Sequence, residues 1–188
     1  ISYLDPDVET RYQPYRSHTS LDAIATDAIT QLGLPLIVKP NSGSEGTNVA
    51  KCSSQTEVKG ALARIYDKTS DHYDNLALIQ KYIEIVDEYR AIAFDKKIIL
   101  VYKKDVSEAS VQDNYSPLHR EGAKALHITS KNLIARLEKF TQPIYQMIPI
   151  EYCGYDIAQD VNGELWLIEV NTLPMFTIFL EHNSSDII

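Results

Sequence analysis

Hydrophobic residues recur along this chain at two spacings, one typical of helices and one typical of strands. The helical spacing predicts three helices. The first runs from Thr19 or Ser20 to about residue 32 and is ended by Gly33, and the second begins with the capping box Ser54 and Glu57. The third covers residues 131–147, where Pro143 should kink or split it. Short apolar runs predict strands at 36–39, 48–51, 76–83, 88–94 and 97–102, and two more on either side of 161–164. Residues 1–18 and 172–188 show neither spacing, so we expect irregular segments there, the first as a linker or the tail of an absent N-terminal domain.

The last predicted hairpin gathers polar side chains on one face. Asn162 and Gly163 form the strongest hairpin signal in the chain, and a two-residue loop there fixes the pairing of the two strands. Counting back from that loop, Asp156 lies directly opposite Glu169, and Asn171 shares the face of Glu169. The opposite face is apolar, and we expect it to be core; it comprises Tyr155, Ile157, Trp166, Ile168 and Val170.

Two facing carboxylates repel each other, and the remedies are a shared proton, a basic neighbour or a bound cation. Oxygen ligands on a rigid hairpin suit a hard ion that bridges phosphates, so Asp156, Glu169 and Asn171 are candidate ligands for Mg²⁺, or for Mn²⁺. A solvated acidic face is the alternative interpretation. A calcium loop that begins at Asp160 is excluded, because its sixth position is Leu165 rather than glycine.

The loop length decides whether this site exists. A three-residue loop of Val161, Asn162 and Gly163 would slide the register by one residue. Asp156 would then oppose Ile168, and the carboxylates would point to opposite faces unless a bulge corrected the register. The apolar face around Trp166 favours the two-residue loop.

A second chemical signal is a loop rich in glycine and serine that follows the strand at 36–39. Glycines allow backbone N–H groups to converge on an anion, and Lys39 at the end of a buried strand can place a charge on a phosphate. The loop is neither a P-loop nor a dinucleotide-binding fingerprint, because no Gly-Lys-Ser/Thr follows and no helix opens there. An ordinary hairpin turn remains the alternative.

Composition narrows the class of protein. The 188 residues are 44% hydrophobic and carry a net charge of −8, without a basic stripe, so we expect neither nucleic acid nor an anionic membrane as partner. No apolar run approaches the length of a membrane span. Cys52 and Cys153 lack the spacing of a metal site, which predicts reduced thiols in a cytoplasmic protein.

Five segments, taken in order, resemble the ATP-grasp superfamily, and most closely its D-alanine–D-alanine ligase-like branch. The resemblance covers residues 19–180, and the segments are 36–40 with the Ser/Gly loop, 79–83, 88–90, 155–156 and 168–174. It implies an α+β fold of two lobes whose antiparallel sheets and flanking helices clamp ATP. The smaller lobe would span 19–84 and the larger lobe 85–188.

The resemblance also implies roles for individual residues. Lys39 would contact the α- and β-phosphates, and Lys103 or Lys104 the γ-phosphate. The loop that would fold over the phosphates runs over 42–47, with Ser42, Gly43, Ser44, Glu45 and Gly46 as candidate cofactor-binding residues. The adenine would lie at Gln80, Lys81, Tyr82 and Ile83, and the ribose at Glu88, which stands one residue further from Gln80 than the family pattern, so we expect a small bulge. Asp156, Glu169 and Asn171 would hold two Mg²⁺ ions.

The chain departs from the family pattern at the substrate end. Members that join D-alanines place an arginine two residues before the metal-binding aspartate, where this chain has Gly154, and a glycine after the final proline, where it has Met175. Arg120 is the candidate for the missing cation. The resemblance therefore implies a ligase that joins a small-molecule carboxylate to an amine through an acylphosphate, with a substrate other than D-alanine. A nucleotide-binding module without ligase activity, a divergent D-alanine–D-alanine ligase and a homodimer stay open.

Overall fold

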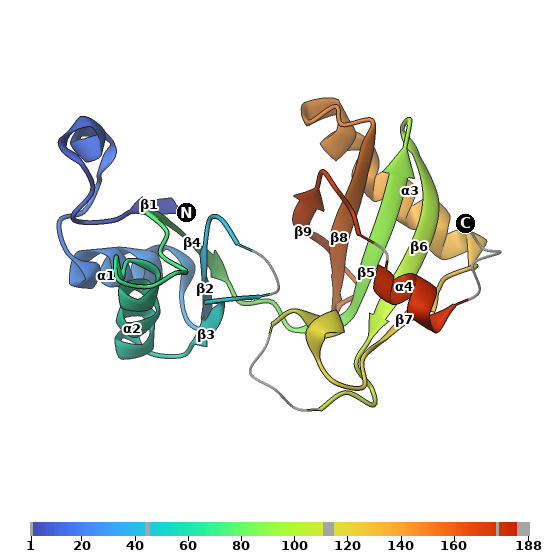
Figure 1. Cartoon of the computed structure of the whole chain (residues 1–188), viewed down its shortest axis with the longest axis horizontal. Helices are drawn as coiled ribbons and strands as arrows, with labels where there is room; N and C mark the ends of the chain where they lie inside the picture. Colours follow the sequence, from blue (N-terminus) through green and yellow to red (C-terminus); the bar gives the residue numbers. More distant parts are fainter. Residues whose placement is uncertain (1, 44–45, 111–114, 176, 184–188) are drawn as a thin grey trace. The chain divides into compact units, whose positions relative to one another are not determined.

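The computed structural model describes residues 2–43, 46–110, 115–175 and 177–183. The chain divides into two compact units, residues 1–83 with 113–116 and residues 84–112 with 117–188 (Figure 1). Each unit has an antiparallel sheet and its own hydrophobic core, so the expected α+β class is confirmed.

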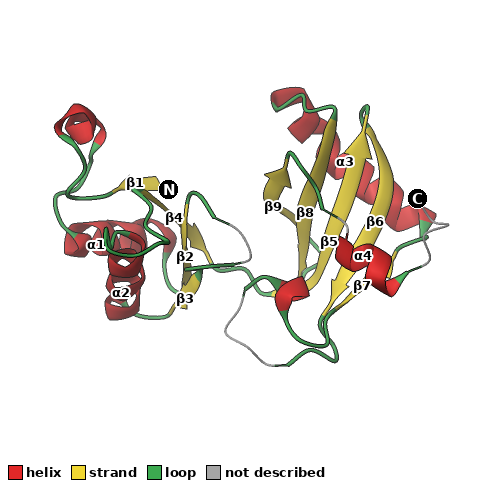
Figure 2. Ribbon diagram, viewed as in Figure 1, coloured by secondary structure: helices red, strands yellow, loops and turns green. Residues whose placement is uncertain are grey.

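The first unit packs two helices on a four-stranded sheet of order β1-β4-β2-β3 (Figure 2). Its elements are β1 (Ser2–Leu4), the 3-10 helix η1 (Thr10–Tyr15), α1 (Leu21–Leu32), β2 (Leu36–Pro40), β3 (Ala50–Cys52), α2 (Gln55–Ile65) and β4 (Leu76–Lys81). Leu36 and Val38 of β2 and Ile79 of β4 alternate onto the sheet face that the two helices cover.

Local signals set the helix ends as predicted. The Ser20 hydroxyl accepts the Ala23 N–H at the start of α1, and Gly33 ends that helix at a φ of 73°. The predicted irregular segment at 1–18 is wrong at its start, because β1 pairs with β4 and Tyr3 is buried in the core. Only three residues pair, which is too short a run for the alternation to stand out in the sequence.

The second unit is a five-stranded antiparallel sheet of order β7-β6-β5-β8-β9. Its elements are β5 (Ile85–Phe94), β6 (Lys97–Asp105), the 3-10 helix η2 (Pro117–His119), β7 (Lys124–His127), α3 (Lys131–Met147), β8 (Tyr152–Asp160), β9 (Leu165–Asn171) and α4 (Thr177–His182). Helix α3 covers one face, where Leu137 meets Tyr89 and Tyr155. Helix α4 covers part of the other face, where Phe179 stacks on Tyr102 with ring centroids 5.3 Å apart.

The expected β5–β6 turn is confirmed, and other expectations for this unit are corrected. The turn is at Asp95 and Lys96, both with positive φ. Pro143 was expected to kink or split the helix, but α3 runs unbroken through it. The predicted irregular tail is wrong, because Thr177–His182 is helical, and strand β7 was not predicted. Among the described residues, none of the helices has the length and apolar character needed to cross a membrane.

The β8–β9 hairpin has the three-residue loop rather than the predicted two-residue loop. The Asp160 N–H donates to the Glu164 carbonyl, and Gly163 closes the turn at a φ of 83°. The register then slides by one, with Ile157 opposite Leu167, until a bulge between Asp156 and Ile157 restores it. Asp156 therefore lies opposite Glu169 as predicted, but through two compensating irregularities.

The bulge changes which side chains are buried. Trp166 was predicted to be core, yet it lies opposite Ala158 on the sheet face away from α3 and is 44% exposed. Its indole N–H donates to Asp160 at 3.0 Å, while Leu165 packs into the core on the α3 side. The prediction for Trp166 failed because simple alternation cannot cross an inserted residue.

Candidate functional site

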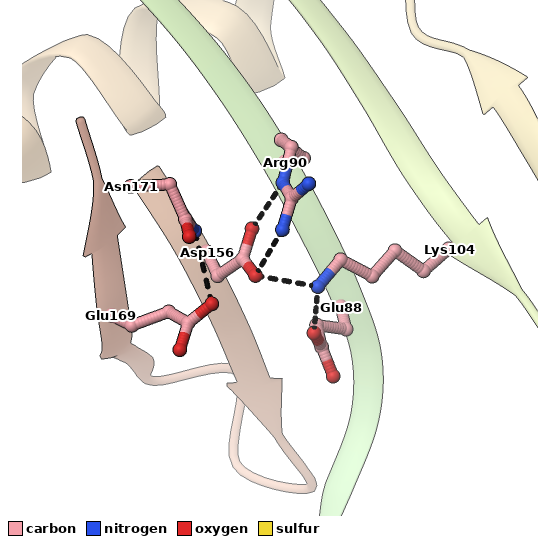
Figure 3. Close-up of polar contacts among 6 residues, drawn as sticks. All are labelled: Glu88, Arg90, Lys104, Asp156, Glu169 and Asn171. Atoms are coloured by element: carbon pink, nitrogen blue, oxygen red, sulfur yellow. Dashed lines mark hydrogen bonds and ion pairs between the residues drawn. The ribbon is translucent and has the colours of Figure 1, made fainter. Parts of the chain in front are cut away.

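A cluster of four charged side chains lies on the face of the second unit's sheet away from α3 (Figure 3). Glu88 and Arg90 come from β5, Lys104 from β6 and Asp156 from β8, and register brings them together because Arg90 pairs directly with Asp156. Arg90 donates to both oxygens of Asp156, from Nε at 2.6 Å and Nη2 at 2.7 Å. The Lys104 ammonium donates to Asp156 Oδ2 at 2.8 Å and also to Glu88.

Burial makes these charges interdependent. Asp156 and Lys104 are only 3% and 7% exposed, so burial opposes the charge on each. The hydrogen bonds from Arg90 and the charge of Lys104 outweigh burial at Asp156 and hold its pKa below the ordinary value. The neighbouring carboxylates likewise raise the pKa of Lys104, which stays protonated. Burial dominates at Glu88 and raises its pKa.

Glu169 and Asn171 extend the cluster onto β9. Glu169 lies opposite Asp156 and is exposed, and its Oε1 accepts from Asn171 Nδ2 at 3.0 Å. The structure thus brings the three predicted metal ligands together on one face (Figure 3). Within the described part of the chain, no three His, Cys, Asp or Glu side chains gather closely enough to hold a metal ion, so an ion here would need the amide of Asn171 as well as the two carboxylates.

The side-chain oxygen atoms of these residues fit a hard divalent cation, but the hydrogen bonds of Asp156 limit how many of its acceptor positions an ion can use. A carboxylate offers about four acceptor positions, and three on Asp156 are used by Arg90 and Lys104. One position on Oδ1 remains, so Asp156 can ligate an ion without releasing either cation. Arg90 and Lys104 also supply the basic neighbours that relieve the repulsion between the facing carboxylates, so that repulsion alone does not require a metal.

The structure separates the two lysines that the sequence left as alternatives. Lys104 belongs to the cluster, whereas Lys103 points to the opposite face of β6 and pairs with Asp87. Arg120, the candidate for the missing cation, follows η2 in the same unit. The arginine in contact with a candidate metal ligand is Arg90, which ends the segment 88–90 and for which no role was predicted.

Gly154 leaves no space for the arginine that the family pattern would place there. A Cβ on Gly154 would lie 2.8 Å from the Cβ of Pro174 and 3.7 Å from Cδ of Arg90. Pro174 is buried, and its Cβ belongs to a ring that cannot rotate away. The Arg90 side chain therefore runs beside the position that a side chain at 154 would occupy. In the sequence, Gly154 was the signal that this part of the site differs from the family pattern.

The remaining predicted residues lie in the first unit. Lys39 is half-buried in β2 opposite Leu78, and Gln80 and Lys81 are exposed at the end of β4. Tyr82 follows them with its N–H bonded to the Pro35 carbonyl. The Lys51 ammonium lies 3.7 Å from the centre of the Tyr82 ring, and Ile83 is half-buried beside it in the chain.

The glycine-rich loop is described only at its two ends, since Ser44 and Glu45 lie outside the described residues. Gly43 and Gly46 have φ values of 135° and 73°, which favour glycine. The Ser42 N–H donates to Asp74 at 2.6 Å, so this backbone group has a protein acceptor where the sequence suggested an anion. Asp74 was not predicted, because nothing local marks a carboxylate that binds 32 residues away.

Comparison with known proteins agrees with the class that the fold and the charged cluster define, the ATP-grasp ligases. The chain belongs to the family described as the D-ala D-ala ligase C-terminus, whose model matches residues 10–183. It is 30% identical over 161 residues to the D-alanine–D-alanine ligase of Burkholderia cenocepacia, covering 84% of this chain and 49% of that protein. It is 25% identical over 171 residues to the enzyme of Clostridium botulinum, of which it covers 54%.

Solved structures share the fold at lower identity. The D-alanine–D-alanine ligase of Bacillus anthracis matches with a TM-score of 0.65 and 23% identity over 94% of this chain and 51% of that one. The ATP-grasp ligase PsnB, solved with a minimal precursor, Mg and ADP, matches with a TM-score of 0.58 and 13% identity, over 97% of this chain and 47% of that one. The chain therefore spans about half the length of the relatives that it matches.

Proposed function

We propose that this chain is the nucleotide-binding and phosphoryl-transfer part of an ATP-dependent ligase that joins a small carboxylate to an amine. In this reaction the carboxylate attacks the γ-phosphorus of ATP, which gives an acylphosphate and ADP. The amine nitrogen then attacks the acyl carbon, phosphate leaves, and the amine loses a proton. Family membership supports the class of reaction, and the identity of both substrates is part of the proposal.

The observation that carries the proposal is the charged cluster on the second unit's sheet. Phosphoryl transfer needs positioning and neutralisation of charge more than covalent catalysis. Arg90 and Lys104 provide one half-buried and one buried cation that two carboxylates hold in place, so little reorganisation is needed when an anion arrives. Asp156, Glu169 and Asn171 would hold Mg²⁺, which would supply the charge neutralisation that the phosphates require.

The proposed roles in the second unit follow from this geometry. Lys104, rather than Lys103, would meet the γ-phosphate, because Lys103 lies on the other face of the strand. Glu88 would bind the ribose hydroxyls through acceptor positions that Lys104 leaves open. Asp156 has one acceptor position left for a metal ion, so Glu169 and Asn171 would supply the other side-chain oxygens that hold Mg²⁺.

In the first unit, Lys39 would contact the α- and β-phosphates, and Gln80 to Ile83 would surround the adenine. These roles rest on the resemblance and on exposure, since Gln80 and Lys81 stand open at the end of β4. The loop at 42–47 would meet the phosphates, with the hydroxyl of Ser42 available rather than its N–H group.

At the acceptor end we propose that Arg90, rather than Arg120, supplies the cation that steadies the acylphosphate and the tetrahedral intermediate. Arg90 has five N–H groups and uses two on Asp156. Burial opposes its charge, but the hydrogen bonds and the charge of Asp156 outweigh burial and raise the pKa of Arg90, so it stays charged. The contact between Gly154 and Pro174 favours an acceptor site shaped differently from that of the D-alanine ligases. The substrate pair is therefore proposed to be other than two D-alanines.

Release of ADP tests this proposal. The protein is incubated with Mg-ATP and candidate carboxylates, D-alanine included, with and without amines, and ADP is followed by a coupled assay. Carboxylate-dependent ADP release is expected, and trapping with hydroxylamine should give a hydroxamate. A second candidate is an ATP-binding module without ligase activity, because Gly154 stands where members that join D-alanines place an arginine. Firm Mg-ATP binding with no turnover for any acceptor would favour that module.

A further inference from the structure

The exit of strand β2 is fastened to a distant segment by backbone and side-chain hydrogen bonds. The Asn41 N–H donates to the Leu76 carbonyl at 3.0 Å, and the Ser42 N–H donates to Oδ2 of Asp74 at 2.6 Å. Beyond the loop, the Asn48 amide makes a longer contact of 3.5 Å with the His72 carbonyl. Residues 72–76 therefore touch the chain on both sides of the glycine-rich loop.

Asp74 is the charged member of this segment, and its two oxygens have separate partners. Oδ1 accepts the Leu76 N–H at 2.9 Å, at the start of β4, and Oδ2 accepts the Ser42 N–H. The side chain is largely buried, with the residue 8% exposed. Hydrogen bonds from N–H groups to a carboxylate are stronger than those between neutral groups, and water competes poorly for a buried acceptor.

We infer that Asp74 is a positioning residue that sets where the phosphate-binding loop leaves the sheet. Asp74 accepts a hydrogen bond from Leu76 at the start of β4, and β4 ends at the proposed adenine-binding residues. It also accepts one from Ser42, at the start of the proposed phosphate-binding loop. Asp74 therefore links the two proposed nucleotide-binding segments of this unit. Asp74 itself does not contact the nucleotide in this account. The inference rests on the proposed function, because it assigns the purpose of the fastening to nucleotide binding.

The same contacts of Asp74 are compatible with an opposite role. A carboxylate that accepts a loop N–H could stand in for a phosphate and be displaced when ATP binds. Asp74 also accepts a hydrogen bond from the Leu76 N–H, and this second bond argues for positioning. If ATP displaced Asp74 from Ser42, a buried carboxylate would keep only one of its two hydrogen-bond partners. The two roles predict opposite effects of removing the charge, which makes them separable.

The test uses Asp74→Asn, which keeps the shape but can accept only one of the two N–H groups, because its NH₂ group cannot accept. Asp67→Asn is the matched control, since Asp67 holds an exposed turn in the same loop through Thr69. Binding of Mg-ATP is measured by titration calorimetry, and binding of adenosine, which lacks phosphates, by competition. Hydrogen exchange at Ser42 is measured by NMR without nucleotide.

We expect Asp74→Asn to weaken Mg-ATP binding about tenfold, which corresponds to about 1.4 kcal/mol, and to change adenosine binding less than about twofold. Exchange at Ser42 should accelerate in that variant alone. Unchanged or tighter Mg-ATP binding, or an equal loss for adenosine, would overturn the inference. If the variant fails to fold, fast exchange at Ser42 in the parent protein would overturn it. If the parent protein binds no Mg-ATP, the proposed function fails. Hydrogen exchange at Ser42 then still tests whether Asp74 holds the exit of β2 in place.

Discussion

The close approach of Gly154 to Pro174 predicts that even alanine at this position destabilises the second unit. The added Cβ would lie 2.8 Å from the Cβ of Pro174, roughly 1 Å inside the separation of about 3.5–4.0 Å that carbon atoms prefer. A second neighbour, Ile92 Cδ1, would lie 3.4 Å from the added Cβ, so the space around it is limited further. Overpacking of this kind costs about 1–3 kcal/mol, so we expect Gly154→Ala to destabilise the second unit by that amount.

Urea unfolding followed by the fluorescence of Trp166 measures this cost, because the chain has one tryptophan and it lies in the second unit. In a Pro174→Gly background the contacting carbon is gone, so the cost of Gly154→Ala should fall by about 1 kcal/mol or more. Gly163→Ala is the control in the same unit, because a Cβ there meets nothing within 4 Å and its cost, which comes from a φ of 83°, should be equal in both backgrounds. An equal cost of Gly154→Ala in both backgrounds, or a cost below about 0.5 kcal/mol, would refute the steric argument.

Two further predictions concern the charges of the cluster. Lys104→Met should destabilise the second unit by about 3–5 kcal/mol in urea, because it removes the ammonium from the buried Asp156 and the largely buried Glu88. Lys103→Met breaks the more exposed pair with Asp87 and should cost about 0–1 kcal/mol. Similar costs for the two variants would contradict the assignment of the two lysines to opposite faces. Burial raises the pKa of Glu88 above its ordinary 4.5, so the stability this group contributes is full below that pH and is lost as the pH rises through the raised pKa. Glu88→Gln should flatten this decline in urea titrations at pH values above 4.5, and an unchanged slope would contradict it.

The hairpin shows how far sequence reasoning reaches in this chain. The pairing of Asp156 with Glu169 was predicted through a two-residue loop, and the structure reaches the same pairing through a three-residue loop and a bulge. Both arrangements place Asp156 and Glu169 on the same polar face, so an alternation of polar and apolar residues cannot distinguish them. The difference appears at Trp166, which the simple alternation buries and the bulge exposes.

Contacts between distant segments were beyond the sequence signals. The Arg90 and Asp156 pair depends on the register of β5 against β8, and the Asp74 and Ser42 pair joins two loops. Capping residues such as Ser20 and Ser54 were predictable, because their partners lie three residues away. Strand β7 and helix α4 are short, and their packing on each other rather than local propensity explains their formation.

The most direct test of the central claim is the Mg²⁺ dependence of ATP binding in the parent chain and in Glu169→Gln. Glu169 is exposed and Gln has its shape, so the variant should keep the fold and lose a repulsion with Asp156. Titration calorimetry should show binding that requires Mg²⁺ in the parent and in the control Glu164→Gln, and at least tenfold weaker binding in Glu169→Gln. Equal Mg²⁺-dependent affinity in all three proteins would contradict the account, because the hairpin would then be a solvated acidic face.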